Sequence, residues 1–425
     1  MPGPSTKPMS ARSPRTAPAT SAELTADSAT APPGLTVRRA VSHAGGLHEF
    51  ATAVWVLAAA ALVALTAAWA VHWVRYPDRA RGHADNPVMA QFWGAPAMAL
   101  MTVGTGTLIL GRGWLGPAAA VDVDWALWLA GTALGLVSTC WIPYLMMTRH
   151  RISADAPFGG LLMPVVPPMV SAATGALLIP YVASAQGRLT LLLACYAMFG
   201  ISLFASVIII TQIWSRLVLH KVGSAVMVPT LWIVLGPLGQ SVTAAGNLGT
   251  QAAHVLPAPY AAGAAVLALL YGVPTWGFAM MWLALAAAIT IRTARRGLPF
   301  ALTWWSFTFP VGTCVTGTIA LATRSDSEAL RGASVVLYAL LLVAWLVVAA
   351  RTVRGSASGR LFRPLASGGL TQRGESGVSP HKRVVKPGFH HPRTTTPGSR
   401  LHRKVPGATP APHPPPPKRR GASHR

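Results

Sequence analysis

The chain has 425 residues, of which 52% are hydrophobic and only 11% are charged, against about a quarter charged in ordinary soluble domains. A soluble domain of this length needs more polar surface, so the composition excludes that class. The formal net charge of +24 indicates nucleic-acid binding only where basic residues gather on one surface. Much of this charge lies in the last segment of the chain, and we expect no nucleic-acid partner.

The N-terminal segment, residues 1–49, is rich in Ser, Thr, Pro and Ala and contains no long apolar run. It is predicted to be a disordered segment. The first apolar run begins near Phe50, too late for a secretory signal peptide, so this run is expected to stay in the membrane.

Residues 50–354 hold apolar runs that are each long enough to cross a hydrocarbon core of about 30 Å. They predict an all-α integral membrane protein made of helical hairpins. The nine expected spans are Phe50–Val74, Met89–Gly111, Asp124–Met147, Leu161–Ala183, Leu189–Trp214, Ser224–Gly249, Ala262–Ile291, Phe300–Ala322 and Ala333–Ala350.

The short loops that follow the odd-numbered spans carry most of the loop Arg and Lys residues, for example Arg75, Arg149, Arg216 and Arg292. Cytoplasmic loops collect such residues. The loops therefore predict a multi-pass protein of the cell (plasma) membrane with a cytoplasmic C-terminus. Nine spans then place residues 1–49 outside, although that segment is also basic. His72 and Asp124 lie at span ends and are expected at the membrane interface.

The tail, residues 355–425, is basic and Pro-rich and contains Glu375 as its one acid. It predicts a disordered cytoplasmic segment that rests on anionic lipid headgroups. The alternative is a membrane-anchored interaction protein that recruits a partner through this tail, with the helices as an anchor. Transport that survives deletion of the tail would favour the first interpretation.

Prolines beside small residues recur in every second span, at a nearly even spacing of about 70 residues, as expected of an internal repeat. They are Pro96, Pro167 with Pro168, Pro237, and Pro310. A proline inside a membrane helix leaves a carbonyl without its partner, which is tolerated beside protein or water. We therefore expect proline-kinked inner helices around a central pore, although each kink could equally be a packing feature.

Three segments at these prolines resemble the tellurite-resistance/dicarboxylate transporter family, which includes slow-type voltage-dependent anion channels, malate permeases and sulfite efflux pumps. The segments are Thr303-Trp304-Trp305-Ser306-Phe307-Thr308-Phe309-Pro310, Leu235-Gly236-Pro237-Leu238-Gly239-Gln240, and Asn86-Pro87-Val88-Met89 with Phe92-Trp93-Gly94-Ala95-Pro96. The resemblance covers about residues 50–352.

The resemblance implies ten helices in five hairpins, a pore in each protomer lined by the five odd helices, and a homotrimer. It implies that Phe309, directly before the proline of the ninth helix, is the pore gate, although from the residues alone Phe309 could be a packed core aromatic. It implies a small anion as substrate, such as a C4-dicarboxylate like malate, sulfite or a similar oxyanion. Nothing before Phe50 has the character of the family's first helix, so we also expect that the chain is a truncated relative with impaired transport.

Small polar groups on the proline-bearing spans could replace the hydration shell of an anion, although such hydroxyls often bond their own helix. Ionisable side chains are almost absent from the span centres, which favours a channel or uniporter over a proton-coupled pump. No motif of an enzyme, a metal site or a cofactor occurs, so we expect none of these. The expected pore-lining or kink residues are Gly94, Pro96, Pro167, Pro168, Gly236, Pro237, Gly239, Gln240, Thr308 and Pro310.

Overall fold

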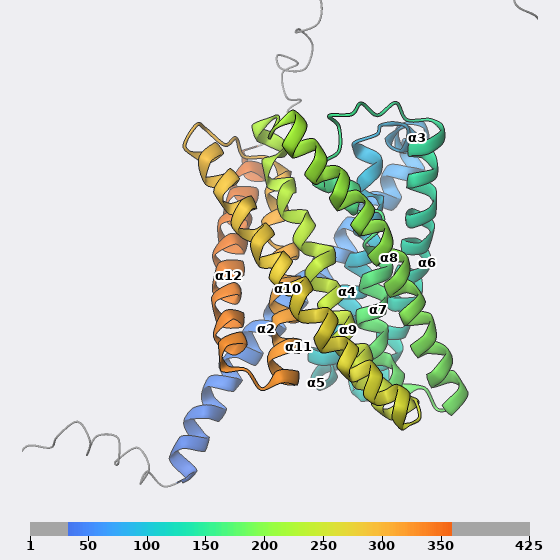
Figure 1. Ribbon diagram of the computed structural model, residues 1–425, viewed down its shortest axis with the longest axis vertical. Helices are drawn as coiled ribbons and strands as arrows, with labels where there is room; N and C mark the ends of the chain where they lie inside the picture. The colour runs from blue at the N-terminus through green and yellow to red at the C-terminus, as the bar shows by residue number, and fades with distance from the viewer. Residues whose placement is uncertain (1–32, 359–425) are drawn as a thin grey trace, which may run out of the picture. The chain divides into compact units, whose positions relative to one another are not determined.

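The computed structural model describes residues 33–358, and this part of the chain is helical with no strand. Figure 1 shows the arrangement. The α-helices are α2 (Pro33–Arg75), α3 (Pro77–Asp85), α4 (Gly94–Leu110), α5 (Arg112–Leu115), α6 (Pro117–Thr148), α7 (Pro167–Leu178), α8 (Ala185–His220), α9 (Leu235–Val255), α10 (Ala258–Ala294), α11 (Phe309–Ser325) and α12 (Glu328–Ala357). The 3₁₀ segments are η1 (Met89–Trp93), η2 (Gly159–Leu162), η3 (Ile179–Tyr181), η4 (Ala225–Val234) and η5 (Leu302–Phe307).

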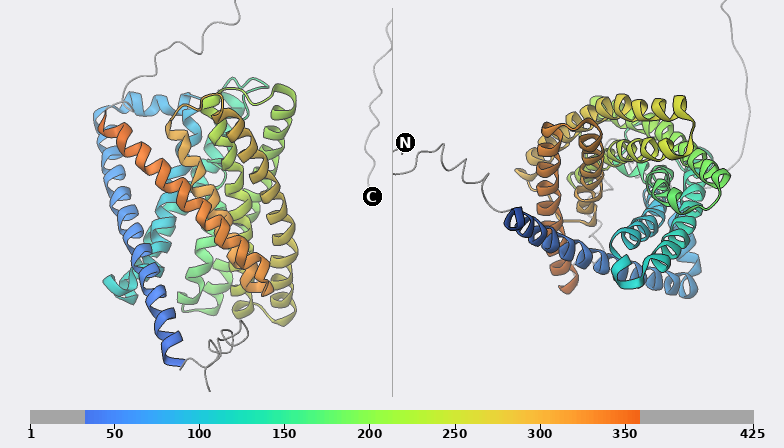
Figure 2. Two further views of the ribbon diagram at one scale, coloured as in Figure 1. Left: turned by 90° about the vertical axis from the view of Figure 1, so that its left-hand side faces the viewer. Right: turned by 90° about the horizontal axis from the view of Figure 1, so that it is seen from below.

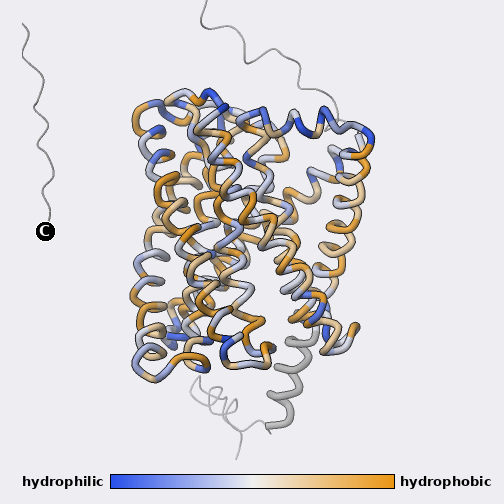
Figure 3. The backbone as a smooth tube through the Cα atoms, turned by 90° about the vertical axis from the view of Figure 1, so that its right-hand side faces the viewer, coloured by the Kyte–Doolittle hydropathy of each residue, from blue (hydrophilic) through white to orange (hydrophobic). Residues whose placement is uncertain are grey.

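The helices have the lengths and composition of membrane spans. Within residues 33–358, eight helical stretches are long and apolar enough to cross a bilayer. Hydrophobic residues fill the middle of these helices, and hydrophilic residues gather at both ends (Figure 3). The prediction of an all-α, multi-pass membrane protein is confirmed.

The fourth expected span, 161–183, differs from the other eight. Its α-helix, α7, has only 12 residues and is continued at its two ends by η2 and η3. Eleven residues of α7 are buried. A segment that is surrounded by other helices in this way needs no continuous apolar surface toward lipid, which explains its small residues and its short helix.

The first and last helices extend well beyond the expected spans. Helix α2 begins at Pro33, ahead of the expected start at Phe50, and α12 continues to Ala357, beyond the expected end at Ala350. Hydropathy detects only the apolar part of a helix, and both extensions contain Arg residues. The remainder of the N-terminal segment, residues 1–32, and residues 359–425 of the tail lie outside the described residues.

The helices form an inner and an outer set. In α4, α9 with η4, and α11 with η5, between 44% and 78% of the apolar window is buried, whereas the values for α10 and α12 are 17% and 11%. Seen along the helices, α4, α7, α9 and α11 surround a central space, and α6, α8, α10 and α12 lie outside them (Figure 2, right). Helix α2, none of whose window is buried, also lies outside.

The repeated prolines lie at the start of the inner α-helices. Pro167 is the first residue of α7, Pro310 the second of α11, and Pro96 and Pro237 the third of α4 and α9. A 3₁₀ segment precedes each of these helices. Since the first turn of an α-helix has no acceptor for its N–H groups, a proline there removes no hydrogen bond. The expected kinks therefore take the form of a change from 3₁₀ to α-helix.

Glycines hold successive inner segments together at their backbones. A Cβ on Gly94 would lie 1.9 Å from the carbonyl oxygen of Met163, and a Cβ on Gly159 would lie 1.8 Å from that of Thr230. A Cβ on Gly239 of α9 would lie 2.5 Å from the backbone nitrogen of Cys314 in α11. Among the described glycines, none makes a contact of this kind between α11 and α4.

Candidate functional site

The inner helices enclose a cavity of about 1220 Å³. Its wall comes from α4, α7, α9, η5 and α11, and from the outer helix α12. The lining residues are Thr102, Thr105, Ile109, Val170, Ala173, Thr174, Leu177, Gln240, Thr243, Gly246, Asn247, Thr250, Trp305, Thr308, Phe309, Gly312, Thr313, Val315, Thr316, Ile319, Ala320, Thr323, Arg324, Tyr338, Leu341 and Trp345. Among the described residues that line it, none is Asp, Glu or His, and Arg324 is the one charged side chain.

Most threonine hydroxyls of the lining satisfy their donor within the wall. Thr102 donates to the carbonyl of Met98, and Thr174 donates to that of Val170, each at 2.8 Å. The hydroxyls of Thr243 and Thr316 lie 2.8 Å apart and join α9 to α11. Each bonded hydroxyl still has lone pairs and a methyl group to present, so the wall is polar without being charged.

Three of the expected site residues line the cavity. Gln240 is 8% exposed, and its amide makes no hydrogen bond within residues 33–358. The hydroxyl of Thr308 donates to the carbonyl of Trp305 at 2.8 Å. Phe309 is 37% exposed. The other expected residues lie in the wall without lining the cavity: Gly94, Pro96, Pro167, Pro168, Gly236, Pro237, Gly239 and Pro310.

The segment from Thr303 to Phe309 anchors one end of the cavity. The Thr303 hydroxyl donates to the carbonyl of Val226 at 2.9 Å, which ties η5 to η4. The buried ring of Phe307 packs edge-on against Trp232 and Trp304, with centroids 5.1 and 5.7 Å away. The side chains of Thr303, Trp304 and Phe307 do not line the cavity. Their contacts fix the backbone next to Phe309.

Phe309 lies where η5 passes into α11, at the end of the cavity nearer the basic loops. Its ring is beside Gly236 of α9, since a Cβ built on that glycine would be 4.0 Å from Phe309 Cε1. Along α11, Phe309 and Arg324 are separated by roughly 22 Å at 1.5 Å per residue. The aromatic ring and the guanidinium thus mark opposite ends of one cavity.

Arg324 is a lining residue that sequence reasoning placed in a loop. It lies in the last turn of α11, where its Nη2 donates to the carbonyl oxygen of Gly246 and to the Thr250 hydroxyl, each at 2.9 Å. The hydropathy window ended the span at Ala322, two residues too early. Extending the helical period of α11 by one turn would have placed Arg324 on the face of Thr316 and Thr313.

Asp124 was expected at the end of its span, and the structure places it further inside the helix. The helix α6 begins at Pro117, so Asp124 is two turns inside it, and the side chain is fully buried against α4. A Cβ on Gly104 would lie 2.6 Å from Asp124 Oδ1. Neither carboxyl oxygen has a hydrogen-bond partner among the described residues. His72 lies in the last turn of α2, at the end of its span as expected, with its Nε2 buried and its ring stacked on His83 at 5.6 Å.

Arg216, which was counted as a topological signal, is a buried structural residue. Only 8% of it is exposed. Its Nε donates to the carbonyl oxygen of Pro157 at 2.8 Å, and its Nη1 donates to those of Lys221 and Val222 at 2.8 and 3.2 Å. It therefore joins two loops at the basic end. Within residues 33–358, no group of three or more His, Cys, Asp or Glu side chains could hold a metal ion.

Comparison with known proteins agrees with this architecture. Residues 30–353 match the voltage-dependent anion channel family. A sulfite efflux pump of Trichophyton rubrum is 26% identical over 324 residues, which cover 75% of this chain and 85% of that protein. The sulfite efflux pump of Arthroderma otae is 26% identical over 329 residues, with the same coverage. An uncharacterised transporter of Methanocaldococcus jannaschii is 25% identical over 298 residues, 69% of this chain and 82% of that protein. The chain belongs to the voltage-dependent anion channel family of membrane transport proteins.

Proposed function

We propose that the chain conducts small oxyanions, sulfite or a short dicarboxylate such as malate, through the cavity between α4, α7, α9 and α11. The observation that supports this most is the lining itself: hydroxyl and amide groups, one arginine, and no acidic side chain among the described lining residues. Such a wall offers dipoles to an anion without binding it too tightly and repels no negative charge. The names of the fungal relatives favour sulfite.

The pathway acts as a channel or uniporter. Proton coupling needs a titratable group in contact with the path, and the described lining contains no Asp, Glu or His. Asp124 is separated from the cavity because it lies between α4 and α6. The driving force in this proposal is the electrochemical gradient of the anion alone.

Phe309 is the gate in this proposal. Its neighbours in η5 are fixed by their contacts with η4, and its partly exposed ring can move by rotation about its own side-chain bonds or by bending at the η5–α11 junction. Gly236 on the facing helix leaves room for the ring because it has no side chain. This combination supports a constriction that one side chain can open.

The basic loops, at the top of Figure 1, face the cytoplasm in this proposal, with the C-terminus on the same side of the plasma membrane. Arg216 is left out of the orientation argument because its hydrogen bonds give it a structural role. The basic residues that still indicate the cytoplasmic side include Arg75, Arg149, Arg292 and Arg296. In a variant with Cys140, Cys195 and Cys314 replaced by Ala, Ser215→Cys should resist an impermeant thiol reagent added to intact cells. Gly113→Cys, which is at the opposite end in open surroundings, should react. The reverse pattern overturns the orientation.

The functional test is anion flux in proteoliposomes containing the full chain. Sulfite, malate, succinate, nitrate, chloride and tellurite are compared at equal inserted protein, with a variant ending at Ala357 as the test of the tail. We expect sulfite or dicarboxylate flux that exceeds that of protein-free vesicles and that persists in the shortened variant. Flux of none of these anions contradicts the proposal. The homotrimer implied by the family resemblance is checked by the mass of the detergent-extracted protein.

A further inference from the structure

Arg324 retains hydrogen-bonding capacity at one end of the cavity. Its Nη2 serves the two contacts with α9, at Gly246 and Thr250. Its Nη1 makes no hydrogen bond within residues 33–358, and its Nε is buried without a partner. A guanidinium has five N–H donors, so most of its donor capacity is uncommitted.

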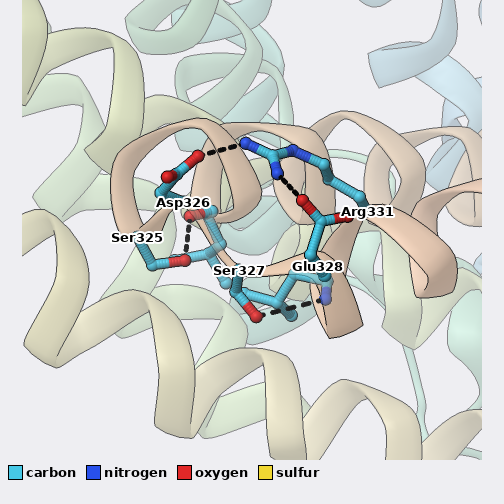
Figure 4. A network of polar contacts seen from close by, with 7 residues as sticks. Ser325, Asp326, Ser327, Glu328 and Arg331 are labelled. Atoms are coloured by element: carbon cyan, nitrogen blue, oxygen red, sulfur yellow. Dashed lines mark hydrogen bonds and ion pairs between the residues drawn. The ribbon is translucent and has the colours of Figure 1, made fainter. Parts of the chain in front are cut away.

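The nearest acids in the sequence are occupied by another arginine. Asp326 and Glu328 both form ion pairs with Arg331 across the turn between α11 and α12 (Figure 4). Ser327 caps α12 in the same turn by accepting from the N–H of Leu330 at 3.4 Å. Among the described side chains, no carboxylate lies within ion-pair distance of Arg324. Its positive charge is therefore left for the cavity.

The structural role of Arg324 accounts for only part of this arrangement. The carbonyl end of α11 carries partial negative charge, and a cation in its last turn stabilises it. The bonds from Nη2 to Gly246 and Thr250 join α11 to α9. They leave Nη1 and the N–H of Nε without a partner among the described residues, and they do not explain why the acids nearest in the sequence pair with Arg331 instead.

We propose that Arg324 is an oxyanion-binding site at this end of the cavity, which collects the transported anion before it passes to the Thr243–Thr316 hydroxyl pair. The inference rests on the proposed function and names the residue that recognises the substrate. The N–H groups of Nη1 can donate to one oxygen of an oxyanion while another oxygen accepts from a neighbouring group, whereas chloride offers a single centre. Thr323, the neighbouring lining residue, adds a hydroxyl that makes no other hydrogen bond in the described part of the chain.

The test compares the half-saturating concentrations of sulfite and chloride for flux in proteoliposomes. Arg324→Gln should raise that of sulfite about tenfold, because charge-assisted hydrogen bonds are replaced by neutral ones, and should affect chloride much less. Arg324→Lys should give an intermediate value, because it keeps the charge and loses the planar fork. Arg331→Gln frees the carboxylates of Asp326 and Glu328, which are two and four residues along the chain from Arg324, and should also raise the value for sulfite, with an effect that disappears at high salt.

The control is Arg112→Gln. Arg112 lies at the same end and donates to Leu108 and Tyr181, but it does not line the cavity, so the half-saturating concentration should not change. Unchanged sulfite values for Arg324→Gln overturn the site, as does an equal effect on chloride. If Arg324→Gln does not fold, unchanged values for both Arg324→Lys and Arg331→Gln overturn it. Absence of flux in the unmodified chain contradicts the proposed function instead.

Discussion

The two sides of the ring of inner helices are built differently. From α4 through α7 and α9 to α11, a glycine of one segment meets the backbone of the next, as at Gly94 and Met163. Between α11 and α4, the wall consists of side chains from the outer helix α12, namely Tyr338, Leu341 and Trp345. Helices α2 and α12 lie on that side (Figure 2).

Backbone contacts and side-chain contacts tolerate change differently. A backbone atom cannot move aside without shifting its whole helix, whereas a side chain adopts another rotamer at small cost. The side of the ring that runs from α4 through α7 and α9 to α11 is the glycine-joined side. Its backbone contacts therefore fix the positions of Phe309, Gln240 and the lining threonines. The α12 side determines how well the cavity is separated from its surroundings.

The largest effect is expected from a methyl group on the glycine-joined side. Gly94→Ala places a Cβ against the carbonyl oxygen of Met163, and we expect it to destabilise the fold by at least about 3 kcal/mol. The measurement is the fraction of monodisperse protein and its melting temperature in detergent. Gly263→Ala in α10, where a Cβ meets nothing within 4 Å, is the matched control. Equal behaviour of the two variants would mean that the backbone contact is not needed.

The second prediction concerns the constriction held by the glycine-joined side. Phe309→Ala should raise anion flux several-fold, because it removes the ring that closes the path in the proposed gate. Phe309→Trp should not raise it. Phe307→Ala is the control, since that ring is buried between Trp232 and Trp304 and its loss should lower stability without raising flux. A folded Phe309→Ala protein with unchanged flux would identify Phe309 as a packing residue.

A third experiment alters the α12 side. Fusing a membrane helix of the family's first-helix type ahead of residue 33 should cover the space between α11 and α4 and raise flux, by less than Phe309→Ala does. The exposed Pro96 at the start of α4 would then be covered by protein. Flux is compared at equal inserted protein, and a fused helix of scrambled sequence is the control. If both fusions match the unmodified chain, the side chains of α12 already close the cavity.

The smallest effect is a change in stability expected at Asp124 of α6, which packs against α4. Asp124→Ala removes two buried oxygens that have no partner among the described residues, and we expect a gain of about 1 kcal/mol in stability. The exposed neighbour Asp122 is the control, since Asp122→Ala should change the melting temperature little. A loss of stability in Asp124→Ala alone would indicate that the carboxyl has a partner in the membrane-embedded protein.

The hydropathy of the sequence was enough to predict the all-α membrane fold, because the requirement for roughly 20 apolar residues per span is strong and local. The span at 161–183 was located but its form was not, since the burial of α7 by its neighbours cannot be detected from hydropathy. The even spacing of Pro96, Pro167, Pro237 and Pro310 identified the inner segments. It could not show that each proline begins an α-helix, because that depends on the 3₁₀ segment before it.

Individual site residues were less predictable. Gln240, Thr308 and Phe309 were found because they adjoin the repeated prolines. Arg324 was missed because a charge near a span end is usually assigned to the loop, and only the packing of α11 against α9 shows that it lines the cavity. Asp124 was misplaced for a related reason, since its burial depends on the extra turns that Pro117 adds to α6.

The separation of Phe309 and Arg324 at opposite ends of one cavity has an electrical consequence. Water and ions in the cavity would hold its length at nearly the potential of the solution on the Arg324 side, so the membrane voltage would fall mainly across the short barrier at Phe309. Each elementary charge that crosses that barrier then gains or loses about 2.3 kcal/mol per 100 mV. The steepness of the current–voltage relation would thus depend on the residue at position 309 more than on any other residue of the wall.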